Sequence, residues 1–180
     1  MSLISWNELE QEAAEALGLL KTGVVTRAEA GTSQTDNRAR TLDDPPPDLK
    51  NHIESSYNGK DILLVMEKTI TASDIDEKQN RLLFGVNNVK NQFLITQEEK
   101  NKVNQPGGLQ VSVIDPCFET IPGVKLKKRT KKESQYSAYV LTGNWSKIPQ
   151  NEMNHLRKND TVRLWSFRHG SELFFALVKT

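Results

Sequence analysis

The stretch TVRLWSFRHGSELFFALV, residues 161–178, indicates the fold class of this chain most directly. Polar and apolar side chains alternate through residues 161–167, and a period of two is typical of a half-buried β-strand. Gly170 then marks a turn, after which residues 173–178 form a continuous apolar segment. Two such segments around a short glycine-containing turn predict a β-hairpin.

Further strand patterns precede this hairpin along the chain. They are found at residues 62–66, 82–84, 109–113, 118–126 and 136–141. Between them, Ser-x-x-acid at residues 73–76 and Thr-x-x-acid at residues 96–99 resemble capping boxes. The first predicts a short helix or turn, and the second predicts a short helix that ends near Val103. Seven short strands with two or three small helices predict a mainly β fold, either an open barrel or a sandwich.

The first part of the chain has a different character. Residues 3–20 carry apolar side chains at helical spacing with acids between them, which predicts an amphipathic helix with Ser5 as its cap. Residues 21–48 lose this periodicity and end in Pro45, Pro46 and Pro47, which predicts a flexible linker, and a short helix is expected from Leu49 to Tyr57. We therefore expect an N-terminal segment at 1–48 and a folded domain at 49–180.

Bulk properties limit the class of protein. No stretch of about 18 apolar residues is present, and the N-terminus lacks the basic and apolar series of a secretory signal. Cys117 is the single cysteine, which excludes an internal disulfide and fits a reducing compartment. The net charge of +1 divides unevenly: residues 1–50 hold nine acids and five bases, and the remainder holds fourteen and nineteen. An acidic front and a basic body favour a nucleic-acid module with a separate tail.

Signals of catalysis are missing from the sequence. The three histidines, His52, His155 and His169, lie far apart, so zinc-ligand spacing is absent. There is no nucleophile elbow, no phosphate-binding Gly-Lys-Ser/Thr loop and no dinucleotide fingerprint. Asp74, Asp76 and Glu77 lack the glycine and distal glutamate of a calcium loop and suit helix capping instead. We expect no enzyme activity, no metal and no cofactor.

The strongest signal from the residues alone is KLKKRTKK, residues 125–132, in which six of eight side chains are basic. Three readings are open, and they do not exclude one another. Such side chains bind DNA phosphates without reading sequence, they serve as a nuclear-import signal, or they form a solvated basic loop.

Three segments, taken in order, resemble the plant-specific B3 DNA-binding domain family. They are Glu67–Asp74 followed by Asn80–Leu83, then Tyr139–Trp145, and finally Leu156–Val162. The subgroup is similar to small B3 domain-containing proteins of the reproductive-meristem-like type, which share a Pro-Pro segment and a helix start like that at Phe93–Glu99. Departures are Phe84-Gly85, where many members have Pro-Lys, and the long basic insertion.

This resemblance implies a seven-stranded open pseudobarrel that clasps double-stranded DNA in the major groove with two arms. The N-arm corresponds to residues 76–81 and the C-arm to residues 134–147. The loop of the N-arm combines groups suited to guanine and to adenine edges, although the residue types alone also fit an ordinary polar loop. The expected DNA-binding residues are Lys68, Lys78, Gln79, Asn80, Arg81, Arg129, Lys131, Lys132, Thr142, Asn144, Ser146 and Lys147.

The sequence thus predicts a nuclear plant transcription regulator that binds specific duplex sequences and has no membrane or small-molecule partner. Trp145 and the aromatic residues of the hairpin are expected in the core, which disfavours a stacking platform for single strands. An alternative is a protein-interaction module on a B3-like barrel with nonspecific DNA affinity, in which the helix at residues 3–20 binds a protein. The recognition half of a restriction-type nuclease is a third option, disfavoured because a catalytic carboxylate cluster is missing.

Overall fold

The computed structural model describes residues 43–180, so the helix predicted at residues 3–20 and most of the predicted linker lie outside the described part. The folded unit begins at Pro45. Helix α2 spans Pro47–Tyr57, two residues earlier than the sequence suggested. Pro46 stands at the N-cap position without a side-chain hydrogen bond, and Pro47 occupies the first turn, where a proline costs no hydrogen bond and its fixed φ suits a helix.

Seven strands follow, as the sequence predicted. They are β1 (Lys60–Thr69), β2 (Leu82–Gly85), β3 (Leu109–Ile114), β4 (Thr120–Lys131), β5 (Tyr136–Gly143), β6 (Thr161–His169) and β7 (Glu172–Lys179). They form one sheet in the order β1-β6-β7-β3-β4-β5-β2, in which β3 and β7 run parallel and every other neighbouring pair is antiparallel. Because β1 and β2 are the two ends of this order, the sheet is open, and the mainly β pseudobarrel is confirmed.

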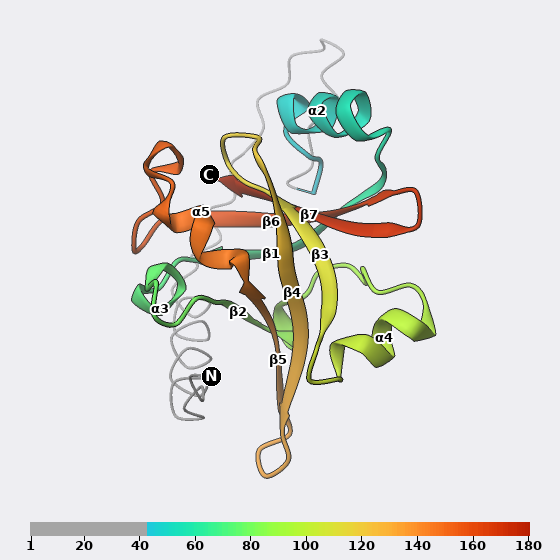
Figure 1. Ribbon diagram of the computed structural model, residues 1–180, viewed down its shortest axis with the longest axis vertical. Coiled ribbons are helices and arrows are strands. Elements are labelled where there is room, and N and C mark those ends of the chain that lie inside the picture. The colour runs from blue at the N-terminus through green and yellow to red at the C-terminus, as the bar shows by residue number, and fades with distance from the viewer. Residues whose placement is uncertain (1–42) are drawn as a thin grey trace, which may run out of the picture. The chain divides into compact units, whose positions relative to one another are not determined.

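The sheet bends sharply along its length. In Figure 1, β1, β6 and β7 run across the view, whereas β3, β4 and β5 run up and down it. The interior between these two parts holds the larger cluster of buried side chains, among them Met66, Leu126, Trp145, Leu164 and Phe175. The alternation read from residues 161–167 therefore describes a strand that lines a filled barrel.

A second, smaller core lies beneath α2. Leu49 and Ile53 of this helix pack with Trp165, Phe167 and Phe174 of the terminal hairpin. Burial of an aliphatic or aromatic side chain of this size stabilises a fold by about 1.5–3 kcal/mol, so α2 is an integral part of the domain. None of the helices described in residues 43–180 is long and apolar enough to cross a membrane.

The remaining helices are short: α3 (Ala72–Ile75), α4 (Gln97–Val103) and α5 (Lys147–Gln150), with 3₁₀ turns η1 (Val86–Asn88), η2 (Asn144–Ser146) and η3 (Glu152–Asn154). Helix α4 starts where the sequence predicted, because the Thr96 hydroxyl accepts from the Glu99 N–H and the Glu99 carboxylate accepts from the Thr96 N–H. The predicted cap of α3 at Ser73 is wrong, since Thr71 occupies the N-cap and its N–H donates to Asp74 Oδ2 at 2.8 Å.

Strand β4 also differs from its prediction at both ends. It begins at Thr120 instead of Phe118, because Phe118 has a φ of 65° and belongs to a turn in which Asp115 Oδ1 accepts from the N–H groups of Cys117 and Glu119. It continues past Leu126 to Lys131, paired with β5 throughout and ending opposite Tyr136. Most of the basic run is therefore a β-strand, which excludes the reading of this run as a solvated loop.

Candidate nucleic-acid interface

The two predicted arms meet at Asn80. The side-chain amide of Asn80 donates through Nδ2 to the Gly143 carbonyl at 2.5 Å, and its Oδ1 accepts from the Ser146 N–H at 2.7 Å. The Asn80 carbonyl accepts from Thr142 Oγ1 at 3.0 Å. Asn80 has a φ of 45°, a left-handed conformation that asparagine tolerates better than most residues. Residues 76–81 and 142–146 are thus fastened together by one side chain, and its amide acts in positioning.

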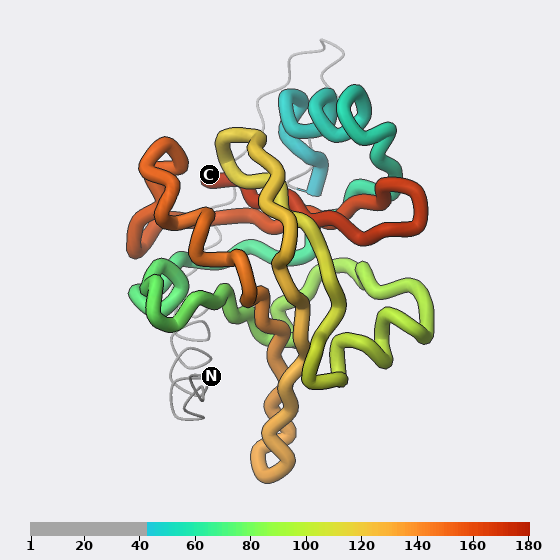
Figure 2. Tube along the Cα trace, in the orientation of Figure 1, coloured from blue at the N-terminus to red at the C-terminus, as the bar shows by residue number. Residues whose placement is uncertain are grey.

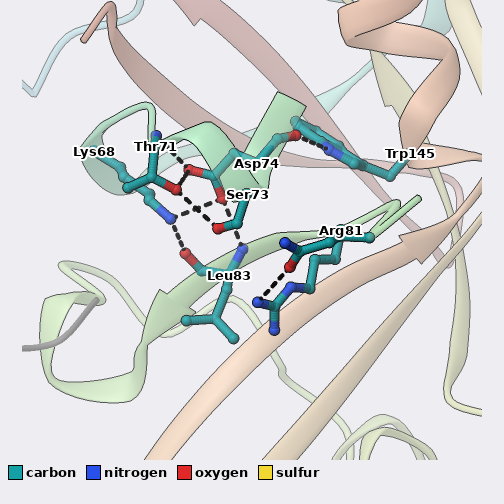
Figure 3. A network of polar contacts seen from close by, with 8 residues as sticks. Lys68, Thr71, Ser73, Asp74, Arg81, Leu83 and Trp145 are labelled. Atoms are coloured by element: carbon teal, nitrogen blue, oxygen red, sulfur yellow. Dashed lines mark hydrogen bonds and ion pairs between the residues drawn. The ribbon is translucent and has the colours of Figure 1, made fainter. Parts of the chain in front are cut away.

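The buried carboxylate of Asp74 organises the residues next to this junction. Asp74, 1% exposed, accepts hydrogen bonds from Lys68 Nζ at 2.9 Å, from the Thr71 hydroxyl at 2.9 Å and from the Leu83 N–H at 3.4 Å. Its main-chain carbonyl accepts from Trp145 Nε1 at 2.9 Å, as Figure 3 shows. The fully buried Trp145 is part of the main core. The base of each arm is therefore held by the same network, and the Lys68 ammonium belongs to that network.

Arg81 is buried where the sequence suggested an exposed reader of bases. Its side chain lies at the start of β2, is 2% exposed, and donates through Nη2 to Gln79 Oε1 at 2.9 Å (Figure 3). The strand that follows is entirely buried, which draws Arg81 inward together with Leu82. Contact between Arg81 and a base stays a prediction, and in this conformation Arg81 positions Gln79 within the N-arm.

Other predicted side chains lie at the surface near the junction. Lys78 is exposed at the tip of the N-arm, where its N–H donates to Asp76 Oδ1 at 2.9 Å. Lys147 is exposed at the start of α5. Asn144 Nδ2 donates to the Pro122 carbonyl at 2.8 Å, over Gly123. Gly123 has a φ of 74°, and a Cβ there would lie 2.6 Å from Asn144 Nδ2, so this position requires glycine.

The basic run contributes one row of cations, because strand β4 directs alternate side chains to opposite faces of the sheet. Lys125, Lys127, Arg129 and Lys131 pair with Thr142, Val140, Ala138 and Tyr136 and share one face with them. Lys128 pairs with Tyr139 and shares the other face with the buried Leu126. No residue from Thr120 to Lys131 is acidic, so all the charged side chains of this strand are positive.

The row adds Lys125 and Lys127 to the residues predicted from the sequence. Lys125 lies beside the C-arm, since its Cγ is 3.6 Å from the position of a Cβ built on Gly143. Both residues can be identified from the alternation of side chains along a strand, because every second residue lies on the same face. This alternation applies only once the run is known to be a strand. Lys132 belongs to the β4–β5 turn, which projects far from α3 and the N-arm in Figure 2.

Tyr139 and Glu99 are among the titratable groups whose pKa values are displaced. Burial raises the pKa of the Tyr139 phenol. Burial also opposes ionisation of Glu99, but hydrogen bonds from Arg168 and from the N–H groups of Ile95 and Thr96 outweigh it and lower the pKa of Glu99. Within residues 43–180, no group of three or more His, Cys, Asp or Glu side chains is placed to hold a metal ion.

The family model and the curated relatives that match this chain point to the same family. The family model described as B3 domain-containing protein At2g31720-like matches residues 43–180. B3 domain-containing protein At1g05920 of Arabidopsis thaliana is 32% identical over 146 residues, covering 70% of this chain and 42% of that protein. B3 domain-containing protein At3g25182 of the same plant is 31% identical over 166 residues, covering 87% of this chain and 46% of that protein. The chain therefore spans less than half the length of these curated relatives.

Among solved structures, the Arabidopsis FUS3-DNA complex aligns with a TM-score of 0.44 at 13% sequence identity, covering 65% of this chain and 98% of that one.

Proposed function

The chain belongs to the family of B3 domain-containing proteins of the At2g31720-like type, and from this premise we propose that it binds specific sequences of double-stranded DNA through the major groove. The observation that carries the proposal is the junction at Asn80, which holds both arms together beside Lys125, the first of a row of four cations along β4. Rigid presentation of polar groups next to a phosphate-binding surface is what duplex recognition requires.

The cation row supplies affinity. Lys125, Lys127, Arg129 and Lys131 are spaced along one strand face, where alternate residues lie about 6.6 Å apart. Phosphates on one DNA strand follow each other at a comparable spacing, and each neutralised phosphate releases a counterion. This contribution is independent of DNA sequence and weakens steeply with salt, so the row positions the duplex and the arms discriminate between sequences.

The arms supply the base contacts. Lys78 and Gln79 at the tip of the N-arm carry groups suited to guanine and adenine edges, respectively. Ser146 and Lys147 follow β5 on the other side of the junction, together with Asn144, whose Nδ2 also donates to the Pro122 carbonyl. Asn80, Thr142 and Lys68 act mainly by positioning, because their polar groups bond to other residues of the protein. Arg81 acts through Gln79.

We further propose that the protein acts in the nucleus as a plant transcription regulator. Duplex recognition places its target there, and residues 125–132 carry the density of basic side chains that nuclear-import signals use. Most of this run is folded into β4, so its import role depends on the exposed end of the strand and on Lys132.

The test is a selection from a random duplex library with the full chain at physiological salt, followed by sequencing of the bound DNA. A short enriched motif, with Gln79→Ala and Lys78→Ala changing individual positions within it, supports the proposal. Each lost bidentate contact is expected to cost about 1–3 kcal/mol of discrimination. Binding that is salt-sensitive but enriches no motif would leave only the nonspecific function of the cation row.

A further inference from the structure

A pocket of about 400 Å³ lies on the face of β4 opposite the cation row. Its walls come from η1 and the segment after it, from α4, and from the central parts of β4 and β5. In Figure 1, α4 lies on the opposite side of β4 and β5 from α3. The proposed DNA interface uses none of the residues that line this pocket.

The floor of the pocket is apolar and belongs to the core. Phe93, Leu94 and Val103 are each at most 5% exposed and belong to the main core. The ring of Tyr139 forms a further wall, with its centroid 5.2 Å from that of Phe93 and 5.6 Å from that of Phe84. A surface of this kind favours a flat apolar or aromatic group, because such a group buries its faces against rings already held in place.

The charged side chains that line the pocket are all positive, and its other polar side chains are the neutral Asn91, Gln92 and Asn104. Lys90, Lys100 and Lys128 line it, and no aspartate or glutamate does. Among residues 43–180 none of these three lysines has an ion-pair partner, although several other lysines of the domain do. The Tyr139 phenol is protonated at neutral pH, as an ordinary tyrosine is, and burial raises its pKa further above 10.0, so it is able to donate a hydrogen bond to an anion.

We propose that this pocket binds a small amphipathic anion, with an aromatic or other apolar body against Phe93, Val103 and Tyr139 and a carboxylate, sulfonate or phosphate held by Lys100 and Lys128. The volume lies within the usual range for small-molecule sites, about 300–1,000 Å³, and the combination of apolar floor and few convergent polar groups is typical of them. Three cations with no carboxylate among the lining residues set the sign of the ligand's charge. This function is separate from DNA binding.

The first experiment titrates the full chain with 8-anilinonaphthalene-1-sulfonate and, in parallel, with N-phenyl-1-naphthylamine, which has the same aromatic body without the sulfonate. We expect saturable binding of the sulfonate at one site, with at least a fivefold lower Kd than the neutral probe. Equal affinities for the two probes, or the absence of saturable sulfonate binding, would overturn the proposal.

Neighbouring lysines on β4 provide a matched pair of variants. Lys128→Gln removes a pocket cation, whereas Lys127→Gln removes the adjacent cation on the opposite face of the same strand. We expect Lys128→Gln to raise the Kd for the sulfonate about fivefold, Lys100→Gln to do the same, and Lys127→Gln to leave it unchanged. Circular dichroism melting curves confirm that each variant is folded, and failure of both pocket variants to weaken binding contradicts the assignment.

Measurements of duplex DNA binding distinguish a separate small-anion pocket from a surface that contacts DNA phosphates. If the pocket binds small anions in its own right, Lys128→Gln leaves DNA affinity at the level of the unchanged protein while Lys127→Gln lowers it. If instead duplex DNA displaces the sulfonate and Lys128→Gln weakens DNA binding as much as Lys127→Gln does, the lysines of the pocket are part of the DNA surface and the proposal fails.

Discussion

Asn80 Oδ1 accepts a hydrogen bond from the main-chain N–H of Ser146 at 2.7 Å, across 66 residues of sequence. The same side chain donates to the carbonyl of Gly143, so one asparagine amide satisfies a donor and an acceptor at the turn after β5. A mobile loop gives an imprecise site, whereas contacts of this kind hold recognition groups in a defined geometry before DNA arrives.

Replacing Asn80 with alanine is expected to lower the free energy of unfolding by about 1–3 kcal/mol, because both main-chain groups lose their partner and alanine tolerates the left-handed φ poorly. Urea denaturation followed by circular dichroism measures this. Asn87→Ala, at an exposed position of η1, is the control and should change the free energy by less than about 0.5 kcal/mol. Equal effects of the two variants would mean that Asn80 does not fasten the arms.

Asp74→Asn is expected to be the more damaging change. The carboxylate is 1% exposed and balances the Lys68 ammonium at 2.9 Å, and removal of one partner from a buried pair costs about 3–5 kcal/mol. Thermal and urea unfolding measure the loss. Asp76→Asn, a carboxylate close in sequence that accepts one main-chain hydrogen bond, should cost no more than about 1 kcal/mol. If Asp74→Asn lowered the free energy of unfolding by less than about 1 kcal/mol, the network would not depend on the negative charge of Asp74.

Lys127→Gln is expected to weaken binding to all duplexes alike and to reduce the slope of log Kd against log salt by about 0.9, the value of one phosphate contact. Fluorescence anisotropy at several salt concentrations, with a preferred and an unrelated duplex, measures both effects. Lys128→Gln is the control, because it lies on the opposite face of β4. A change in sequence preference without a change in salt slope would place Lys127 among the base contacts instead.

The pKa of Glu99 leads to a prediction about how the stability of the protein changes with pH. Hydrogen bonds from Arg168 and the cap of α4 outweigh burial and hold the pKa of Glu99 below its ordinary value of 4.5. The unfolded chain therefore binds more protons than the folded one in this range, so stability rises with pH. The contribution of Glu99 is present above its unfolded pKa and is lost as pH falls through the folded pKa.

Glu99→Gln should accordingly be less stable than the unchanged protein at pH 7, and the difference should shrink as pH falls from about 5 towards 3. Urea midpoints across this range measure it. Glu98→Gln, at an exposed position of the same helix, should show little difference at any pH. A gap for Glu99→Gln that persists undiminished at pH 3 would contradict the assigned linkage.

Local patterns account for most of the fold prediction. The alternation in residues 161–167 and the Thr96–Glu99 capping box depend on neighbours in sequence, and both are found where expected. The cap at Thr71 was missed because two overlapping Ser/Thr-x-x-acid patterns compete, and the winning one depends on the carboxylate of Asp74 also reaching Lys68 and Leu83. The strand predicted from the sequence ends at Leu126, because the charged residues that follow show no apolar alternation. In the structure β4 continues to Lys131, since these residues pair with β5.

The sequence by itself determined the seven strands, the family resemblance and the position of the basic run, because periodicity, turn residues and charge are properties of short segments. Tertiary structure alone decided which polar side chains are available to a ligand. It buried Arg81, used Asn80 to join the arms, and divided Lys127 from Lys128 between two faces of one strand. These outcomes depend on strand register and on contacts between residues more than sixty positions apart, which no local pattern encodes.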